Sequence, residues 1–147
     1  MSDYWKDKNV FITGINGFIG GNLAKALLNK GANITGLVRD RDCNTLLFYE
    51  GLADKVLLVQ GELTNRELLE GIIVEQDIEA VFHFAAQVEV GVAVKNPYLT
   101  FETNIRGTYC LMEAIRTSGN KMRSIVVASS DKSYGSYPKE LMPYKED

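Results

Sequence analysis

The sequence predicts a doubly wound α/β fold of the Rossmann type, in which helices cover both faces of a mostly parallel sheet. Short apolar runs rich in β-branched residues alternate with longer segments of helical period. Strands separated by helices need crossover connections, which make the strands parallel. The first apolar run also leads directly into a glycine-rich turn. With 147 residues, the chain has the usual size of one domain, so we expect a single core.

Five strands are expected, at residues 9–13, 33–38, 55–60, 80–85 and 124–129. Each is a short apolar run, and the sheet is expected to be truncated after the fifth strand. The segment 40–52 is irregular or weakly helical. The segment 131–147 carries glycine and proline and is expected to be loop.

Three helices are expected between the strands, at residues 17–30, 64–76 and 97–118. Gly31 follows the first helix, where a left-handed cap would end it. Thr64 and Glu67 have the spacing of a capping box at the start of the second helix. The third helix begins at Pro97. Its expected apolar face carries Ile105, Thr108, Met112 and Ile115.

Composition and charge exclude several classes of function. The hydrophobic fraction of 46% and the charged fraction of 24% are those of an ordinary soluble globular protein. The net charge of −3, without a lysine and arginine cluster, argues against nucleic acid as a partner. Cys43 and Cys110 lack metal-ligand spacing, so we expect no metal site. No apolar run approaches the ~20 residues of a membrane span, and we expect a cytoplasmic protein with no membrane partner.

The turn at residues 13–20 reads Thr-Gly-Ile-Asn-Gly-Phe-Ile-Gly, and its place between a strand and a helix makes it a candidate dinucleotide site. Gly14 permits a tight turn, Gly17 lets backbone N–H groups approach a pyrophosphate, and Gly20 lets the helix pack close to the sheet. The bound anion would lie at the positive end of the helix dipole. The alternative is a turn that needs glycine only for positive φ angles. The cofactor-binding residues expected here are Gly14, Asn16, Gly17, Phe18 and Ile19.

Arg39 and Asp40 follow the second strand, a position that distinguishes NAD from NADP in dinucleotide-binding folds. An acidic residue there would hydrogen-bond to the ribose 2′-hydroxyl of NAD, whereas an arginine would accommodate the 2′-phosphate of NADP. Arg39 comes first and is a candidate cofactor-binding residue, but two solvated loop charges fit the pattern equally well. The sequence therefore leaves both cofactors open.

Three further motifs follow in order. Residues 61–64 read Gly-Glu-Leu-Thr after the third strand, residues 83–87 read His-Phe-Ala-Ala-Gln at the end of the fourth, and residues 104–108 read Asn-Ile-Arg-Gly-Thr in the long helix. Together with the glycine turn, this ordered set resembles the NAD-dependent epimerase/dehydratase branch of the extended short-chain dehydrogenase/reductase superfamily. The resemblance covers nearly the whole chain, from Thr13 to Asp147.

The resemblance implies further contacts with the cofactor. Glu62 stands where the family has an aspartate that contacts the adenine, and the small residues after the fourth strand let the ribose and nicotinamide lie against the strand end. His83 is interpreted as a structural residue and not as a catalyst, and Ala85 and Ala86 also fit simple helix–sheet packing. The further cofactor-binding residues implied are Glu62, Leu63, Phe84, Ala85, Ala86, Gln87, Asn104 and Ser129.

The segment after the fifth strand points to dehydration. Residues 129–135 read Ser-Ser-Asp-Lys-Ser-Tyr-Gly, and the Asp131-Lys132 pair resembles the Asp-Lys of some nucleotide-sugar 4,6-dehydratases. The resemblance implies that Ser130 hydrogen-bonds the sugar oxygen that is oxidised, that Asp131 is the acid toward the C6 oxygen, and that Lys132 is its proton-transfer partner. Oxidation at C4 acidifies the C5 proton, so a base and an acid with separated pKa values can then remove water across C5 and C6. The alternative is a solvated ion pair at a strand end.

Other parts of the family pattern are not found within residues 1–147. Family members carry a tyrosine and a lysine four residues apart on the next helix, and the chain reaches Asp147 before such a pair. We therefore expect residues 1–147 to be an incomplete NAD(P)-binding domain without the substrate domain, which binds a dinucleotide but does not turn over a nucleotide-sugar alone. The apolar fifth strand would be an open edge, which predicts a homo-oligomer or a complementing second chain.

Two other functions remain open. The chain can be part of a related epimerase or reductase, which an assay of the complete gene product for dehydration against epimerisation would distinguish. It can also be a non-catalytic NAD(P)-binding module.

Overall fold

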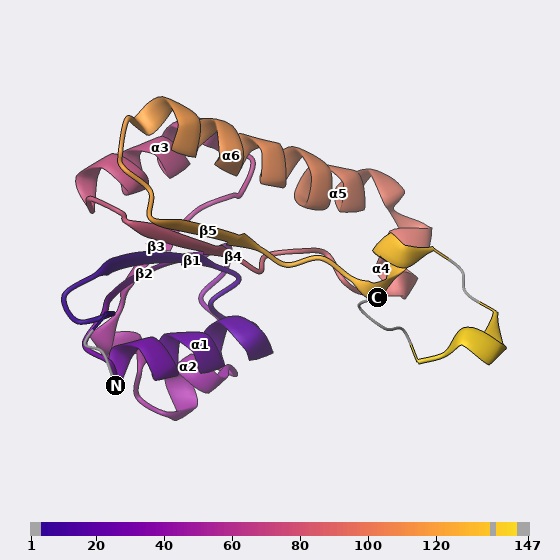
Figure 1. Ribbon diagram of the computed structural model, residues 1–147, viewed down its shortest axis with the longest axis horizontal. Coiled ribbons are helices and arrows are strands. Elements are labelled where there is room, and N and C mark those ends of the chain that lie inside the picture. Colours follow the sequence, from indigo (N-terminus) through magenta and orange to yellow (C-terminus); the bar gives the residue numbers. More distant parts are fainter. Residues whose placement is uncertain (1–3, 136–137, 144–147) are drawn as a thin grey trace.

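The computed structural model describes residues 4–135 and 138–143, and it confirms the doubly wound α/β fold. One sheet of five parallel strands has the order β3-β2-β1-β4-β5. Figure 1 shows helices on both faces, with α1 and α2 on one side and α3 and α6 on the other. The strands are β1 (Asn9–Thr13), β2 (Asn33–Val38), β3 (Leu57–Gln60), β4 (Ala80–His83) and β5 (Ser124–Val127).

The first two strands have the expected bounds, and the other three are shorter. β3 begins at Leu57 because Ala53–Lys55 forms a short 3₁₀ turn, η1. At the other end of the sheet, β4 ends at His83 and β5 ends at Val127, since the chain turns away there into loops.

The helices are α1 (Phe18–Leu28), α2 (Leu46–Tyr49), α3 (Arg66–Glu75), α4 (Val90–Lys95), α5 (Pro97–Phe101) and α6 (Gly107–Ser118). The three expected helices are present with different ends, α2 lies in the segment expected to be irregular or weakly helical, and α4 was not expected. Gly31 has φ of 78°, as expected for the residue after the first helix. The capping box expected at Thr64 is wrong: Asn65 caps α3, and its side chain accepts a hydrogen bond from the N–H of Leu68 over 3.1 Å.

The expected long helix is divided into three parts. Between α5 and α6, the residues Glu102–Arg106 form one π-helical turn, η2. A π turn inserts an extra residue into the helical repeat and rotates the next helical segment about the axis, so the expected apolar face is partly wrong and Ile105 is exposed. The buried residues of α6 are Gly107, Cys110, Leu111, Ala114 and Ile115.

The tail expected as loop contains the short 3₁₀ turns η3 (Asp131–Tyr134) and η4 (Lys139–Leu141).

The core consists of two apolar layers, one on each face of the sheet. Successive side chains of β1 point to opposite faces: Phe11 packs into the layer beneath α3 and α6, and Val10 and Ile12 pack into the layer beneath α1. β1 is the central strand of the sheet, and its residues 10–13 are completely buried between the two layers. Within the residues described, no helix is long and apolar enough to cross a membrane.

Candidate functional site

The loops that carry the expected site residues leave the same edge of the sheet. All strand pairs are parallel, so the loops after β1, β2, β3, β4 and β5 begin at one carboxyl edge. The chain adds β2 and β3 on one side of β1 and then β4 and β5 on the other. This reversal is the topological switch point at which doubly wound sheets open a crevice for a ligand.

Backbone meets backbone at the switch point. Gly14 has φ of 72°, and a Cβ atom there would lie 2.7 Å from the backbone nitrogen of Ala85 and 2.7 Å from the carbonyl carbon of Phe84. A Cβ on Gly17 would lie 3.1 Å from the Gly14 oxygen, and one on Gly20 would overlap the same carbonyl group. The glycines therefore allow the turn, the helix start and the loop after β4 to lie in direct contact.

The first turn of α1 begins at the switch point without a side-chain cap, which leaves its N–H groups free of intrahelical partners. Gly17 is the N-cap and makes no side-chain capping bond, and the first turn of α1 contains no acidic residue. Helix starts of this kind attract anions through the dipole and the free N–H groups. The side-chain oxygen of Asn16 is buried without a hydrogen-bond partner among the described residues, while Phe18 is 85% exposed. The glycine cradle and the open helix start fit the diphosphate of a dinucleotide, whereas the unpaired Asn16 oxygen is an acceptor and fits a hydroxyl donor.

The end of β2 carries an exposed ion pair. The Arg39 guanidinium lies 2.8 Å from the Asp40 carboxylate, whose hydrogen bond raises the pKa of the arginine further. The side-chain amide of Asn16 donates to the backbone oxygen of Asp40 over 3.3 Å, and Gln60 donates to the backbone oxygen of Arg39 over 3.2 Å. Glu62 adds to the electrostatic effect on Arg39. The loops after β1, β2 and β3 are thus in contact.

The loop after β4 is held by η2. The backbone N–H of Gln87 donates to the side-chain oxygen of Asn104 over 2.7 Å, and the side-chain amide of Asn104 donates back to the backbone oxygen of Gln87 over 3.0 Å. Behind this loop, Leu63 packs against Gly107, where a Cβ would lie 2.5 Å from the leucine side chain. Leu63 is therefore a buried residue that packs against α6. Ala86 is exposed.

His83 lies inside the fold, where it bonds to two threonines. The residue is 3% exposed, and its ring nitrogen Nδ1 lies 2.6 Å from the Thr13 hydroxyl and Nε2 2.9 Å from the Thr108 hydroxyl. Burial lowers the pKa of His83 from its ordinary value. The role of Thr13 was not predicted from the sequence. The one feature that could have indicated it is a hydroxyl at the last position of an otherwise apolar strand.

The expected catalytic residues share one exposed turn. Ser130 caps η3, where its hydroxyl accepts the N–H of Lys132 over 3.2 Å, and the Lys132 ammonium lies 3.0 Å from the Asp131 carboxylate. Ser129 is exposed as well. Figure 1 shows the chain continuing from β5 past the edge of the sheet before it reaches this turn. These three consecutive residues follow β5 at the edge of the sheet from which the glycine loop also leaves β1.

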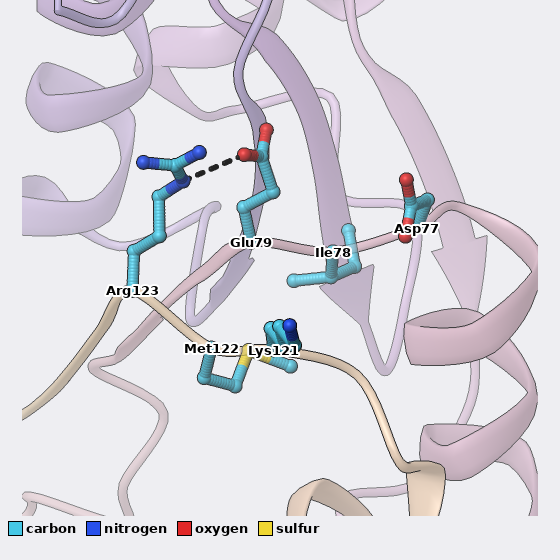
Figure 2. Close-up of a pocket in the computed structure, with 6 residues that line it drawn as sticks. All are labelled: Asp77, Ile78, Glu79, Lys121, Met122 and Arg123. Carbon is cyan, nitrogen blue, oxygen red and sulfur yellow. Dashed lines mark hydrogen bonds and ion pairs between the residues drawn. The ribbon is translucent and has the colours of Figure 1, made fainter.

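One hollow lies at the opposite, amino edge of the sheet. Its volume is about 390 Å³, and Figure 2 shows that its wall includes the ion pair of Glu79 with Arg123, the residues directly before β4 and β5. Its position excludes it as the crevice at the switch point. Across the described chain, no group of acids, histidines or cysteines could hold a metal ion. The lining residues are Asp77, Ile78, Glu79, Lys121, Met122 and Arg123.

Comparison with known proteins agrees with this geometry. A family model described as GDP-mannose 4,6 dehydratase matches residues 11–147. The CDP-glucose 4,6-dehydratase of Salmonella typhimurium is 35% identical over 133 residues, which are 90% of this chain and 37% of that protein. A UDP-glucose 4-epimerase of Neisseria meningitidis is 32% identical over 145 residues, 95% of this chain and 41% of that protein. The chain thus spans well under half the length of these relatives.

Solved structures agree as well. The crystal structure of UDP-glucose 4-epimerase from Bifidobacterium longum, in complex with NAD⁺ and UDP, superposes with a TM-score of 0.80 at 26% identity. The match covers 95% of this chain and 42% of that one. The resemblance expected from the ordered motifs is confirmed.

Proposed function

Because the chain belongs to the GDP-mannose 4,6 dehydratase family, we propose that residues 1–147 supply the NAD-binding domain of a nucleotide-sugar 4,6-dehydratase. Its relatives are nucleotide-sugar 4,6-dehydratases and UDP-glucose epimerases. The observation that carries the proposal is the glycine loop: Gly14 lies on the loop after β4 beside an uncapped helix start. Such a helix start binds a diphosphate through backbone N–H groups.

The proposed cofactor site uses the four loops that are in contact. The backbone amides of Phe18 and Ile19 would hold the diphosphate, with Gly17, whose own N–H donates to the Gly14 oxygen, and Asn16 at its side. The adenosine would lie by the loops after β2 and β3, near Arg39 and Glu62. The other end would lie along residues 84–87, toward Ser129. When bound, the nicotinamide would take a hydride from C4 of the sugar.

We propose NAD over NADP. The Asp40 carboxylate lies against the Arg39 guanidinium, which neutralises the charge that a 2′-phosphate would need. Both side chains are exposed, so the pair is weak and local. The NAD⁺ in the Bifidobacterium longum epimerase supports the same choice.

Dehydration would depend on the turn after β5. We assign Ser130 to the sugar hydroxyl that is oxidised, Asp131 to proton donation toward the C6 oxygen, and Lys132 to proton exchange with Asp131. Their proximity supports these roles, since the ammonium lies 3.0 Å from the carboxylate. Transfer of a proton from the ammonium to the carboxylate would leave a neutral Lys132 amine, which can take the C5 proton, and a protonated Asp131, which can deliver its proton to the departing C6 oxygen; the ion pair is thereby restored.

Simple epimerisation at C4 is the second candidate, favoured by the similarity to UDP-glucose 4-epimerases. Asp131 and Lys132 favour dehydration, because removal of water needs an acid at C6 that C4 epimerisation does not. Product analysis of the complete enzyme distinguishes the two: a 4-keto-6-deoxy sugar indicates dehydration, and a C4 epimer with its 6-hydroxyl retained indicates epimerisation.

The sugar-binding residues are proposed to come from outside residues 1–147, either from further sequence or from a second chain. The relatives are more than twice as long as the matched region. β5 pairs with β4 alone among the described strands, and its side chains are 40–44% exposed at three successive positions. Exposed apolar edges favour pairing with another chain, which supports the expected oligomer. Further exposed apolar residues lie along α4 to α6: Val90, Val94, Tyr98, Phe101, Ile105 and Tyr109.

Calorimetry tests the cofactor site directly. The folded chain is titrated with NAD⁺, NADH and NADP⁺, and saturable heat is expected with both forms of NAD and a weaker response with NADP⁺. Absence of heat with all three would overturn the proposal. Light scattering tests the open edge: self-association is expected at micromolar concentration, and a monodisperse monomer would contradict it.

A further inference from the structure

A chain of hydrogen bonds connects the loop after β4 to η2 through the ring of His83. The N–H of Ala85 donates to the Thr13 hydroxyl over 3.3 Å, and this hydroxyl lies 2.6 Å from Nδ1 of His83. On the other side of the ring, Nε2 lies 2.9 Å from the Thr108 hydroxyl. Thr108 in turn lies 2.7 Å from the backbone oxygen of Asn104. β1, β4, α6 and η2 each contribute one residue to this path.

The direction of every bond in this path is fixed by donor and acceptor chemistry. The carbonyl oxygen of Asn104 only accepts, so the Thr108 hydroxyl donates its one hydrogen there. Thr108 must then accept from Nε2–H of His83. Burial favours the neutral ring by lowering the pKa of His83. A neutral ring with its hydrogen on Nε2 has a lone pair on Nδ1, which accepts the Thr13 hydroxyl.

Both ends of the path hold the same loop. At one end Thr13 accepts from Ala85. At the other end Asn104 clamps Gln87 through two hydrogen bonds of 2.7 and 3.0 Å. The loop also lies directly on Gly14. A rotation of the imidazole or a change of tautomer would disturb both attachments, because each hydroxyl on the path has only one hydrogen to donate.

We infer that His83 is a positioning residue: held in its Nε2–H tautomer between Thr13 and Thr108, it joins the glycine loop, the loop after β4 and Asn104 into one directional hydrogen-bonded unit. The use of this unit, to hold the loops at the switch point for a dinucleotide, rests on the proposed function. The unit itself is a property of the free chain and is tested without any cofactor.

The tautomer is measured by nitrogen NMR. His83 is the one histidine of the chain, so a sample with ¹⁵N-labelled histidine shows a single ring. At neutral pH we expect a protonated Nε2 and an unprotonated Nδ1, without averaging between tautomers. A hydrogen on Nδ1, or an average of the two forms, would overturn the inference.

Coupling along the path is measured by amide hydrogen exchange at Ala85. Thr108→Val keeps the shape of the side chain and removes the acceptor of Nε2–H, which allows the ring hydrogen to move to Nδ1 and compete for Thr13. We expect exchange at Ala85 to become several-fold faster in Thr108→Val and to return to the wild-type rate in Thr108→Ser. A purely local role of Thr108 would leave Ala85 unchanged, and that result would overturn the inference.

A second pair of variants covers the case in which Thr108→Val does not fold. Thr13→Val and Thr13→Ser test the same path from the strand side, where valine suits a buried strand position. Thr13→Val is expected to accelerate exchange at Gln87, across the ring from the substitution, and Thr13→Ser is expected to restore it. Equal exchange at Gln87 in both variants would count against the unit. Calorimetry of the wild-type chain separates the proposed dinucleotide site from the positioning role of His83. Absence of dinucleotide binding would contradict the proposed function, while the NMR and exchange results would still decide the role of His83.

Discussion

A Cβ atom on Gly14 would lie 2.7 Å from the backbone nitrogen of Ala85, closer than a side chain can approach. The glycine loop and the loop after β4 therefore touch without a side chain between them. Because Gly14 also has φ of 72°, two separate constraints act on this one position.

Gly14→Ala is expected to destabilise the fold by at least about 2 kcal/mol, since it combines a positive φ with a backbone clash. Dinucleotide binding should weaken by at least about tenfold, because the loops must separate to admit the methyl group. Urea unfolding and calorimetry measure the two effects.

Gly51→Ala is the matched control. Gly51 has φ of 62°, and a Cβ there would meet no described atom within 4 Å. The Gly51→Ala variant therefore loses only the stability that the positive φ costs an alanine, about 1 kcal/mol. Its dinucleotide affinity should be unchanged. Equal losses of stability and of dinucleotide affinity in the two variants would show that the close approach of Gly14 to Ala85 contributes to neither.

Asp40→Asn is expected to shift the cofactor preference toward NADP. Removal of the carboxylate that lies 2.8 Å from Arg39 leaves the guanidinium free to meet a 2′-phosphate. The ratio of NADP⁺ to NAD⁺ affinity should rise by roughly tenfold, or about 1.4 kcal/mol. Asp54→Asn, at an exposed position before β3, makes the same change of net charge at the other edge of the sheet. A similar shift in that control would assign the effect to net charge.

Stability is expected to depend on the protonation of His83. Burial holds the pKa of His83 in the folded state below its ordinary value of 6.5, so the unfolded chain takes up a proton first as the pH falls. The stabilisation is fully present above pH 6.5 and is lost as the pH falls through the folded-state pKa. The free energy of unfolding, measured by urea at a series of pH values, should decrease below pH 6.5.

His83→Asn removes this titration. The variant should be less stable than the wild type at neutral pH, and its free energy of unfolding should change less between neutral and mildly acidic pH. If the two pH profiles run parallel, groups other than His83 cause the decrease.

Glu79→Gln is expected to cost about 1 kcal/mol of stability. Its carboxylate lies 3.2 Å from the Lys8 ammonium and 2.8 Å from the Arg123 guanidinium, so it connects the segments that enter β1, β4 and β5 (Figure 2 shows the arginine). Burial acts to raise the pKa of Glu79, but the hydrogen bonds from Lys8 and Arg123 outweigh it and hold the pKa below 4.5. Glu113→Gln breaks an exposed pair within α6 and should leave the urea midpoint unchanged.

Asp131→Asn in the complete enzyme is expected to lower kcat for dehydration by about 10² or more, because general acid catalysis supplies acceleration of that order. Dinucleotide affinity should stay at the wild-type value, which separates lost chemistry from lost folding. Glu140→Gln, at an exposed position in η4, removes a charge from the same tail and serves as the control. Unchanged formation of the 4-keto-6-deoxy product in Asp131→Asn would show that the assignment is wrong.

Local sequence pattern predicted the architecture because the pattern reflects burial. β1 and β2 are covered on both faces, so their apolar runs coincide with the strands residue by residue. The glycines of the first turn were also readable, since positive φ and close approach leave few other residue types. Helix ends were less predictable: Thr64 has suitable chemistry for a cap, but the neighbouring Asn65 takes the position.

Sequence by itself determined the fold class and the place of the glycine loop, and the structure supplied the order of the strands. Only the tertiary structure decided which side chains meet at the carboxyl edge of the sheet. His83 bonds to a threonine 70 positions away and to another 25 positions away, through strand register and the packing of α6 on the sheet. Neither partner could be read from local periodicity, because a hydrogen bond between distant segments depends on how whole elements pack against each other.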